Sequence, residues 1–207
     1  MKKPKTRGPS LEKTQETRKK VIDSALQYFI EVGFARAKIS EIAKKAELGK
    51  GTIYSYFETK EHLFEGVIDA LINDSFRPIQ ASEITQNETV YDFICNNIIP
   101  SVLTLESTGR ADMARLILRE GNNFPHIRQT YVNKIFLPIQ RELEQLTSLA
   151  VQRGELCIDI SSRQFALLIV SPMWMSMIHN GILSPDENLP MVLLFKENLK
   201  ILFAQSQ

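Results

Sequence analysis

A segment near the N-terminus combines small, cationic and hydroxyl-bearing side chains with few bulky ones. In KGTIYSYF, residues 50–57, only Ile53 and Phe57 are obliged to face a protein core. The remaining side chains are available to a partner: Lys50, Gly51, Thr52, Tyr54, Ser55 and Tyr56. A helix with so little bulk at its start can enter a groove about 12 Å wide, where ammonium and hydroxyl groups reach phosphates and base edges. The chemistry that this segment favours is hydrogen bonding and ion pairing with a nucleic acid.

A second helix must hold such a segment in place, and the preceding residues have the spacing of a helix-turn-helix. That motif buries apolar residues at its first, fourth and fifteenth positions and a small residue at its fifth. Counted from residue 39, these are Ile39, Ile42, Ile53 and Ala43. We therefore expect a helix-turn-helix at about residues 38–57. The alternative is an ordinary pair of packed surface helices, which can show the same spacing.

The turn between the two expected helices departs from the usual pattern. Its ninth position usually holds glycine, because the backbone there is left-handed, which costs a residue with a β-carbon roughly 1 kcal/mol. Glu47 occupies this position, and Gly49 follows two residues later, where we expect it to relax the turn. An acidic residue is thus expected near the face that meets a nucleic acid.

Longer helices flank this motif. Apolar residues recur at helical spacing from Thr14 to Val32, and Gly33 offers a left-handed stop. After the motif, one amphipathic stripe is formed by Leu63, Phe64, Val67, Ile68, Leu71 and Ile72. Further helical segments are expected at about 90–105, 112–121, 126–152, 162–180 and 190–204. The pattern predicts an all-α protein of about nine helices.

The net charge of +1 hides an uneven distribution. Residues 1–63 contain 14 Lys or Arg against 8 Asp or Glu, a net charge of +6, which leaves −5 for the rest of the chain. The first dozen residues are basic and contain Pro4, Gly8 and Pro9, which favour a mobile arm. This arm is either a solvated tail or a segment that enters a minor groove and neutralises phosphates.

Composition excludes several other classes of protein. Cys95 and Cys157 are 62 residues apart without a CxxC motif, so no disulfide framework and no metal site is expected. Three histidines without metal-spaced carboxylates, and the lack of a phosphate-binding loop after a strand, argue against an enzyme or a cofactor. The longest apolar run, Phe165 to Ile178, has 14 residues, against roughly 20 for a membrane span. We expect a cytoplasmic protein that does not contact the membrane.

Several stretches match one known pattern: Gly33-Phe34, Ile42-Ala43 and Ala46, then KGTIYSYF at 50–57 and KEHL at 60–63. In these residues the chain resembles the TetR family of bacterial transcriptional repressors. The resemblance implies a basic flexible arm at 1–13 and a helix-turn-helix DNA-binding domain at 14–72. It implies a helical ligand-binding and dimerisation domain at 73–207.

The resemblance also suggests which residues contact DNA. Lys50 and Thr52 are expected to read bases, with Tyr54, Tyr56 and Lys60 on phosphates and Gly51 permitting close approach. The expected DNA-binding residues are Lys38, Ser40, Lys50, Gly51, Thr52, Tyr54, Ser55, Tyr56 and Lys60. Where the family commonly caps the second helix with Thr or Ser, this chain has Lys38, so Ser40 is the nearer candidate cap. Tyr56 has the alternative role of packing against the first helix.

The last two helices indicate a dimer. The segment 165–178 is apolar around almost its whole circumference, and the segment 191–203 exceeds a single apolar stripe. A helix that is apolar on all sides must be buried on all sides, which predicts a four-helix interface with a second copy. The interface candidates are Phe165, Leu168, Ile169, Met173, Val192, Phe195, Leu199 and Phe203. The alternative is one buried central helix in a monomer.

A ligand pocket is implied by the resemblance, whose members bind small, often amphipathic effectors. Candidate lining residues are Phe93, Met113, Leu116, Ile117, Phe136, Trp174, Met175, Met177 and His179. Each of them also fits ordinary core packing. The expected function is a homodimeric repressor that binds a palindromic double-stranded operator, associates with the nucleoid when bound, and is released by a small-molecule inducer. The alternative is a TetR-like activator, or a regulator controlled by a protein partner.

Overall fold

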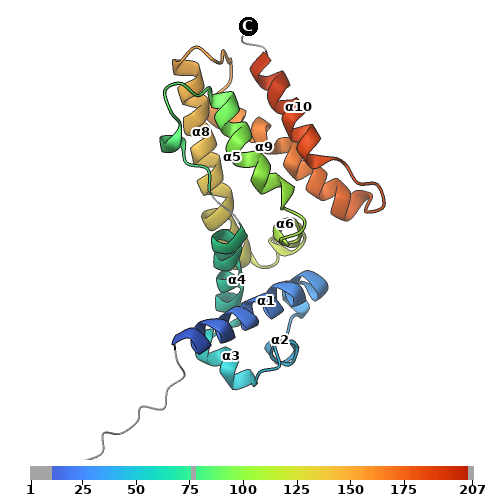
Figure 1. Ribbon diagram of the computed structural model, residues 1–207. Helices are drawn as coiled ribbons and strands as arrows, with labels where there is room; N and C mark the ends of the chain where they lie inside the picture. Colours follow the sequence, from blue (N-terminus) through green and yellow to red (C-terminus); the bar gives the residue numbers. More distant parts are fainter. Residues whose placement is uncertain (1–10, 76–77, 205–207) are drawn as a thin grey trace, which may run out of the picture. The chain divides into compact units, whose positions relative to one another are not determined.

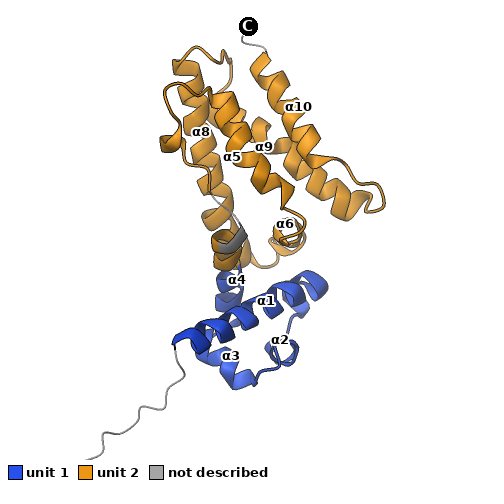
Figure 2. Cartoon of the chain, viewed as in Figure 1, with its two compact units in different colours: residues 1–67 blue, residues 68–207 orange. Residues whose placement is uncertain are grey.

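The computed structural model describes residues 11–75 and 78–204, and every regular element in these two ranges is helical (Figure 1). The predicted all-α fold is confirmed. Most of the predicted basic arm, residues 1–10, lies outside the described ranges. Contacts divide the chain into two compact units, residues 1–67 and 68–207 (Figure 2). The functional division predicted at residues 72 and 73 falls later in the chain and stays a prediction.

Unit 1 contains α1 (Leu11–Arg36), α2 (Ile39–Lys45), α3 (Lys50–Tyr56) and the first half of α4 (Lys60–Ser75). Its core includes three phenylalanine rings, Phe29, Phe34 and Phe64, whose centroids lie 5.5–5.6 Å apart. Each ring is at most 1% exposed. The rings pack the end of α1 against α4. This contact sets the relative position of the two helices that precede and follow α2 and α3 in the chain.

Helix α1 is longer than the predicted segment 14–32, and it is kinked at Gly33. Gly33 has φ 83° and ψ 162°, so the expected positive φ is present but ψ is extended instead of left-handed helical. Glycine adopts this conformation without a steric penalty because it has no β-carbon. The kink directs Phe34 back into the aromatic cluster instead of ending the element.

Unit 2 contains the remaining helices. They are α5 (Val90–Leu103), α6 (Arg110–Glu120), α7 (Pro125–Tyr131), α8 (Leu137–Gln152), α9 (Ser162–Ile178) and α10 (Met191–Ala204). Short elements join them: η1 (Ala81–Glu83), and the π-helical turns η2 (Val132–Phe136) and η3 (His179–Leu183). Because η2 joins α7 directly to α8, the helix predicted over 126–152 forms without an interruption.

Helix α9 is the centre of unit 2, packing against both α8 and α10 (Figure 1). With η3 it forms a helix of 22 residues, Ser162–Leu183, which is long and apolar enough to cross a membrane by length and composition alone. The helix predicted over 162–180 is therefore three residues longer, and the 14-residue apolar run understates the length of apolar helix. Its residues Phe165, Ala166, Ile169 and Met177 are buried, but only 28% of its most apolar window is buried within the single chain.

Candidate nucleic-acid interface and ligand cavity

The four positions that define the helix-turn-helix are all buried. Ile42 and Ile53 are fully inaccessible, and Ile39 and Ala43 are at most 8% exposed. They pack α2 against α3, as the spacing predicts. On the other side of α3, the side chains of Lys50, Tyr54 and Ser55 are exposed, and those of Thr52 and Tyr56 are partly exposed. The structure thus brings the predicted base- and phosphate-binding groups of α3 together on one short helix.

The turn between α2 and α3 has the left-handed residue that the motif requires. Glu47 has φ 54°, and it is the only non-glycine residue with a positive φ in the described ranges. Its carboxylate accepts a hydrogen bond from Lys20 Nζ at 3.0 Å. This hydrogen bond, together with the charge of Lys20, lowers the pKa of the Glu47 carboxyl below its ordinary value. The acidic residue in the turn is therefore paired with a lysine of α1.

Gly49 does not relax the turn, contrary to our expectation. It has φ −71° and ψ 144°, an extended conformation that any residue adopts, and it is the N-cap of α3. The expected cap of α2 is also wrong. Lys38 occupies the N-cap position, α2 begins at Ile39, and Ser40 lies inside the first turn, where it cannot serve as the N-cap.

Lys60 is directed toward the protein instead of toward a phosphate. Its ammonium donates to the carbonyl oxygens of Phe34 at 2.8 Å and of Ala37 at 3.2 Å, and it lies 4.4 Å from the centre of the Phe34 ring. Both carbonyls follow the kink of α1, where the helical donors run out, and the Phe34 carbonyl also accepts from Ala37 N at 3.3 Å. Lys60 therefore ties the start of α4 to the end of α1, and it is withdrawn from the expected DNA contacts.

Gly51 has no packing role that explains its small size. A β-carbon built on it would meet no atom within 4 Å. By contrast, a β-carbon at Gly66 would lie 2.5 Å from Cε1 of Phe57. The fold requires glycine at residue 66 and not at residue 51. Gly51 therefore leaves the backbone near the start of α3 exposed, and a partner can approach that backbone closely.

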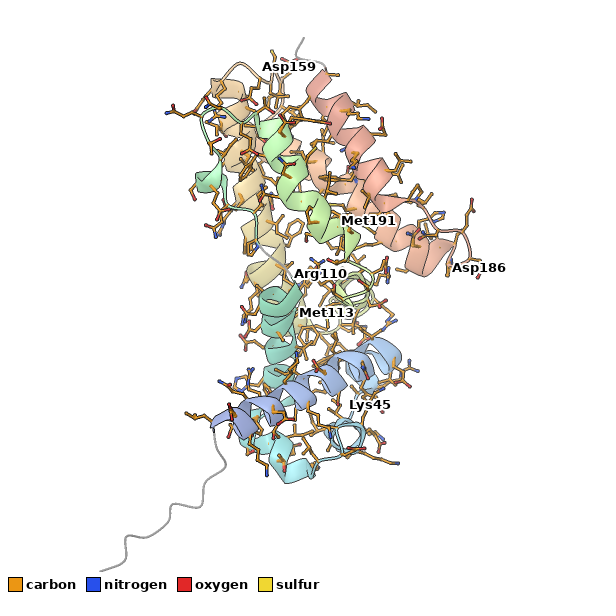
Figure 3. The ribbon with its side chains drawn as sticks, in the orientation of Figure 1. Lys45, Arg110, Met113, Asp159, Asp186 and Met191 are labelled. Carbon is orange, nitrogen blue, oxygen red and sulfur yellow. The ribbon has the colours of Figure 1, made fainter. Side chains whose placement is uncertain are left out.

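Unit 2 contains a partly open cavity of about 90 Å³. Its lining is mainly apolar, with polar groups from Ser101, Arg110, Tyr131 and Gln140. The apolar lining is Leu71, Ile72, Leu105, Met113, Ile135, Phe136, Ile139, Leu143, Ala166, Leu167, Val170, Met173, Trp174 and Met177. Arg110 and Met113 lie one turn apart on α6 (Figure 3). Such a lining suits a small, mostly apolar ligand with a polar group.

Residues 21–67 match the family model for bacterial regulatory proteins of the tetR family. The regulator UidR of Escherichia coli strain K12 is 27% identical over 157 residues, which are 75% of this chain and 77% of UidR. Residues 21–67 are thus a TetR-type DNA-binding domain. The chain is a DNA-binding transcriptional regulator of this type, and TetR-family regulators are non-enzymatic DNA-binding proteins.

Solved TetR-family structures share its fold. FadR of Bacillus subtilis, in complex with stearoyl-CoA, is 23% identical with a TM-score of 0.69 over 90% of this chain and 97% of FadR. SmeT, the repressor of the Stenotrophomonas maltophilia multidrug efflux pump SmeDEF, has been solved with triclosan. That complex has a TM-score of 0.75 at 18% identity, covering 90% of this chain and 91% of SmeT.

Only part of the predicted pocket set lines the cavity of unit 2. Met113, Phe136, Trp174 and Met177 line it. The others do not: Phe93, Leu116 and Ile117 are buried in the core of the unit, Met175 is 48% exposed, and His179 belongs to η3. Helical spacing identifies apolar residues but does not distinguish a core position from a cavity wall, since both are buried.

The predicted dimer residues are also divided. Phe165, Ile169, Phe195 and Leu199 are at most 3% exposed in the single chain, so they belong to its own core, and Met173 lines the cavity. Leu168 is 43% exposed, and Val192 and Phe203 are partly exposed. Four other exposed apolar residues on α9 and α10 are not in the predicted interface set. These are Leu167, Met175, Leu193 and Ile201.

Replacing Glu47 by glycine is expected to stabilise the chain, because glycine adopts a positive φ without strain. Glu47→Gln is the matched control: it removes the charge and keeps the β-carbon. We expect a higher midpoint of thermal unfolding for Glu47→Gly than for Glu47→Gln, measured by circular dichroism. Equal midpoints would show that backbone strain at residue 47 is negligible.

The ion pair between Lys20 and Glu47 makes stability depend on pH. Because Lys20 lowers the folded-state pKa of Glu47, the contribution of this pair to stability is present above the ordinary carboxyl pKa and disappears as pH falls through the lowered value.

Replacing Gly51 by alanine is expected to separate folding from DNA binding. The free energy of unfolding should stay unchanged or rise by up to about 1 kcal/mol, because alanine is the better helix former and meets open space. DNA affinity, measured by fluorescence anisotropy, should fall at least about tenfold, or roughly 1.4 kcal/mol. Gly66→Ala is the control, with lower stability and no new group on the exposed face of α3. Operator binding by Gly51→Ala at wild-type affinity would contradict the close approach.

Proposed function

We propose that this protein is a repressor that binds a palindromic operator as a homodimer and is released by a small amphipathic ligand. In this proposal Lys50 and Thr52 of α3 contact bases, and Lys38, Tyr54 and Tyr56 contact phosphates. The repressor works in the cytoplasm and associates with the nucleoid when it is bound to its operator. FadR with stearoyl-CoA and SmeT with triclosan support a ligand of this amphipathic kind.

The observation that carries the proposal is that one helix, α4, contributes residues both to the core of unit 1 and to the wall of the cavity. This single helix begins with Leu63 and Phe64 in the core of unit 1, and it ends with Leu71 and Ile72 in the wall of the cavity. A ligand in the cavity therefore contacts the helix that supports the helix-turn-helix. Lys134 of η2 also forms an ion pair with Asp69 of α4 at 2.7 Å. The cavity residues Ile135 and Phe136 also belong to η2. A displacement of the cavity wall can therefore act on α4 directly, through the wall residues of α4, or through the ion pair between η2 and α4.

The mechanism follows from linkage between two binding events. In this mechanism α4 has one position in the state that binds DNA and another in the state that does not. A ligand that binds the second state more tightly lowers DNA affinity by that difference, typically 1–3 kcal/mol. The same factor must apply in reverse, so operator DNA must weaken ligand binding equally. A ligand that binds both states with equal affinity changes nothing, however tightly it binds.

Exposed apolar side chains support the dimer. On α9 and α10 these are Leu167, Leu168, Met175, Leu193 and Ile201, each at least 40% exposed in the single chain. Contact with a second copy removes such side chains from water at about 25 cal/mol per Å². A two-fold dimer presents two copies of α3, which requires an operator with inverted half-sites.

The interface is tested by Leu168→Glu, which places a charge on the exposed face of α9. We expect this variant to sediment as a monomer in analytical ultracentrifugation and to lose most of its operator affinity. Leu118→Glu on α6 is the matched control, since Leu118 is 48% exposed but lies on another helix. A dimeric Leu168→Glu variant would place the interface elsewhere.

The regulatory function is tested with the intergenic DNA beside the gene. We expect the protein to shift this DNA at low salt, and deletion of the gene to raise expression of a reporter placed behind it. A ligand that releases the DNA must bind less tightly in the presence of operator, by the same factor. Lower reporter expression after deletion would indicate an activator, and unequal factors would contradict the two-state mechanism.

A further inference from the structure

Besides Ser101 of α5, the polar part of the cavity is made of three buried side chains from three other helices. Arg110 of α6 is 8% exposed, and Tyr131 of α7 and Gln140 of α8 are each 7% exposed. All three line the cavity. A guanidinium, a phenol and an amide place a positive charge and polar hydrogen-bonding groups around one small space. Such a set matches a ligand group that carries several acceptor atoms.

Arg110 is held in place by four hydrogen bonds to neutral oxygen atoms. Its Nη1 donates to Ser101 Oγ at 2.7 Å, and its Nη2 donates to the Ser101 carbonyl at 2.6 Å and to Thr104 Oγ1 at 2.7 Å. Its Nε donates to Thr108 Oγ1 at 2.9 Å. These bonds orient the planar group before a ligand binds. A guanidinium stays protonated in proteins, so a positive charge is presented at the wall of a largely apolar cavity.

Tyr131 adds a donor beside this charge. Burial raises the pKa of the Tyr131 phenol above its ordinary value, with Arg110 acting in the opposite direction. The hydroxyl therefore stays protonated at neutral pH and can donate a hydrogen bond. Hydrogen bonds to a charged acceptor are stronger than neutral ones, and more so where water is excluded. A carboxylate beside these groups would be attracted by the charge of Arg110 and could accept a hydrogen bond from the Tyr131 hydroxyl.

The apolar part of the cavity limits the body of the ligand. Phe136 and Trp174 both line it, with ring centroids 6.3 Å apart at 66°. Met113, Met173 and Met177 supply flexible side chains that adapt to different shapes. A volume of about 90 Å³ compares with roughly 150 Å³ for an engineered cavity that binds benzene. The space accepts one ring or a short alkyl chain.

We propose that the effector is a small carboxylic acid, with its carboxylate on Arg110 and Tyr131 and a single ring or short chain against Phe136 and Trp174. This inference rests on the proposed function, because it specifies the ligand of the same cavity. Arg110 also joins the end of α5 to the start of α6, and this structural role explains its hydrogen bonds without any ligand. The two roles differ in one measurable property, the preference for an acid over its neutral amide.

The chain contains one tryptophan, Trp174, and its position in the cavity wall makes its fluorescence a direct report of binding. Wild-type protein without DNA is titrated with two matched pairs, benzoate and benzamide, and hexanoate and hexanamide. In at least one pair we expect the acid to bind at least about tenfold more tightly than the amide. Tyr131→Phe removes only one hydroxyl and should weaken acid binding about tenfold, with little effect on the amide.

Arg110→Gln should abolish the preference for the acid. Arg119→Gln is its control, because Arg119 lies on the same helix with its side chain 58% exposed. Circular dichroism checks folding, and Tyr131→Phe tests the site independently if Arg110→Gln does not fold. Equal binding of acid and amide in both pairs, or an undiminished preference in Tyr131→Phe and folded Arg110→Gln, would overturn the proposal.

Failure of the acid site is distinguishable from failure of the proposed function. Acid binding that leaves operator affinity unchanged keeps the carboxylate site and overturns the release mechanism. Release of operator by the neutral amides, without any preference for the acids, keeps the release mechanism and overturns the carboxylate site.

Discussion

Three phenylalanine rings, Phe29, Phe34 and Phe64, pack in the core of unit 1, and the helix that carries Phe64 continues into unit 2. This packing determines where α1 and α4 meet, and Lys60 completes it by donating to the carbonyls that follow the kink at Gly33. Helices α2 and α3 have seven residues each, too short to be stable alone. Their position therefore depends on this aromatic contact and on the isoleucines that they bury.

Electrostatics in unit 1 is arranged around the face of α3. The turn places Glu47 near that face, and Lys20 of α1 forms an ion pair with it. A second ion pair, between Lys45 and Glu31, joins α2 to α1. Both pairs are solvent-exposed and contribute little to stability. Each pair uses one positive and one negative charge, so the net charge of +6 in residues 1–63 comes from the remaining lysines and arginines and attracts a polyanion.

Helix α9 contributes residues both to the packed core of unit 2 and to the wall of its cavity. Residues of α9 are fully buried against α8 and α10 on one side, while other residues of α9 line the cavity. Methionine and aromatic side chains in the wall can repack around a ligand, whereas Arg110 is held by fixed hydrogen bonds. A rigid polar anchor in a flexible apolar wall selects the head group of a ligand more strictly than its body. The same wall contains Leu71 and Ile72 of α4, so in the proposed mechanism one set of residues both selects the ligand and responds to it.

The sequence by itself determined the helix-turn-helix, the all-α fold and the left-handed residue in the turn. These features depend on spacing within about twenty residues, such as Ile39 with Ile53, and local geometry makes that spacing readable. Only the tertiary structure decided which apolar residues form a cavity, that Phe165 and Phe195 belong to the core of one chain, and that Lys60 caps α1. It also revealed Arg110, Tyr131 and Gln140 as one polar set, although they come from three helices. Such groupings depend on contacts between residues distant in the sequence, and periodicity along one helix carries no information about what lies opposite.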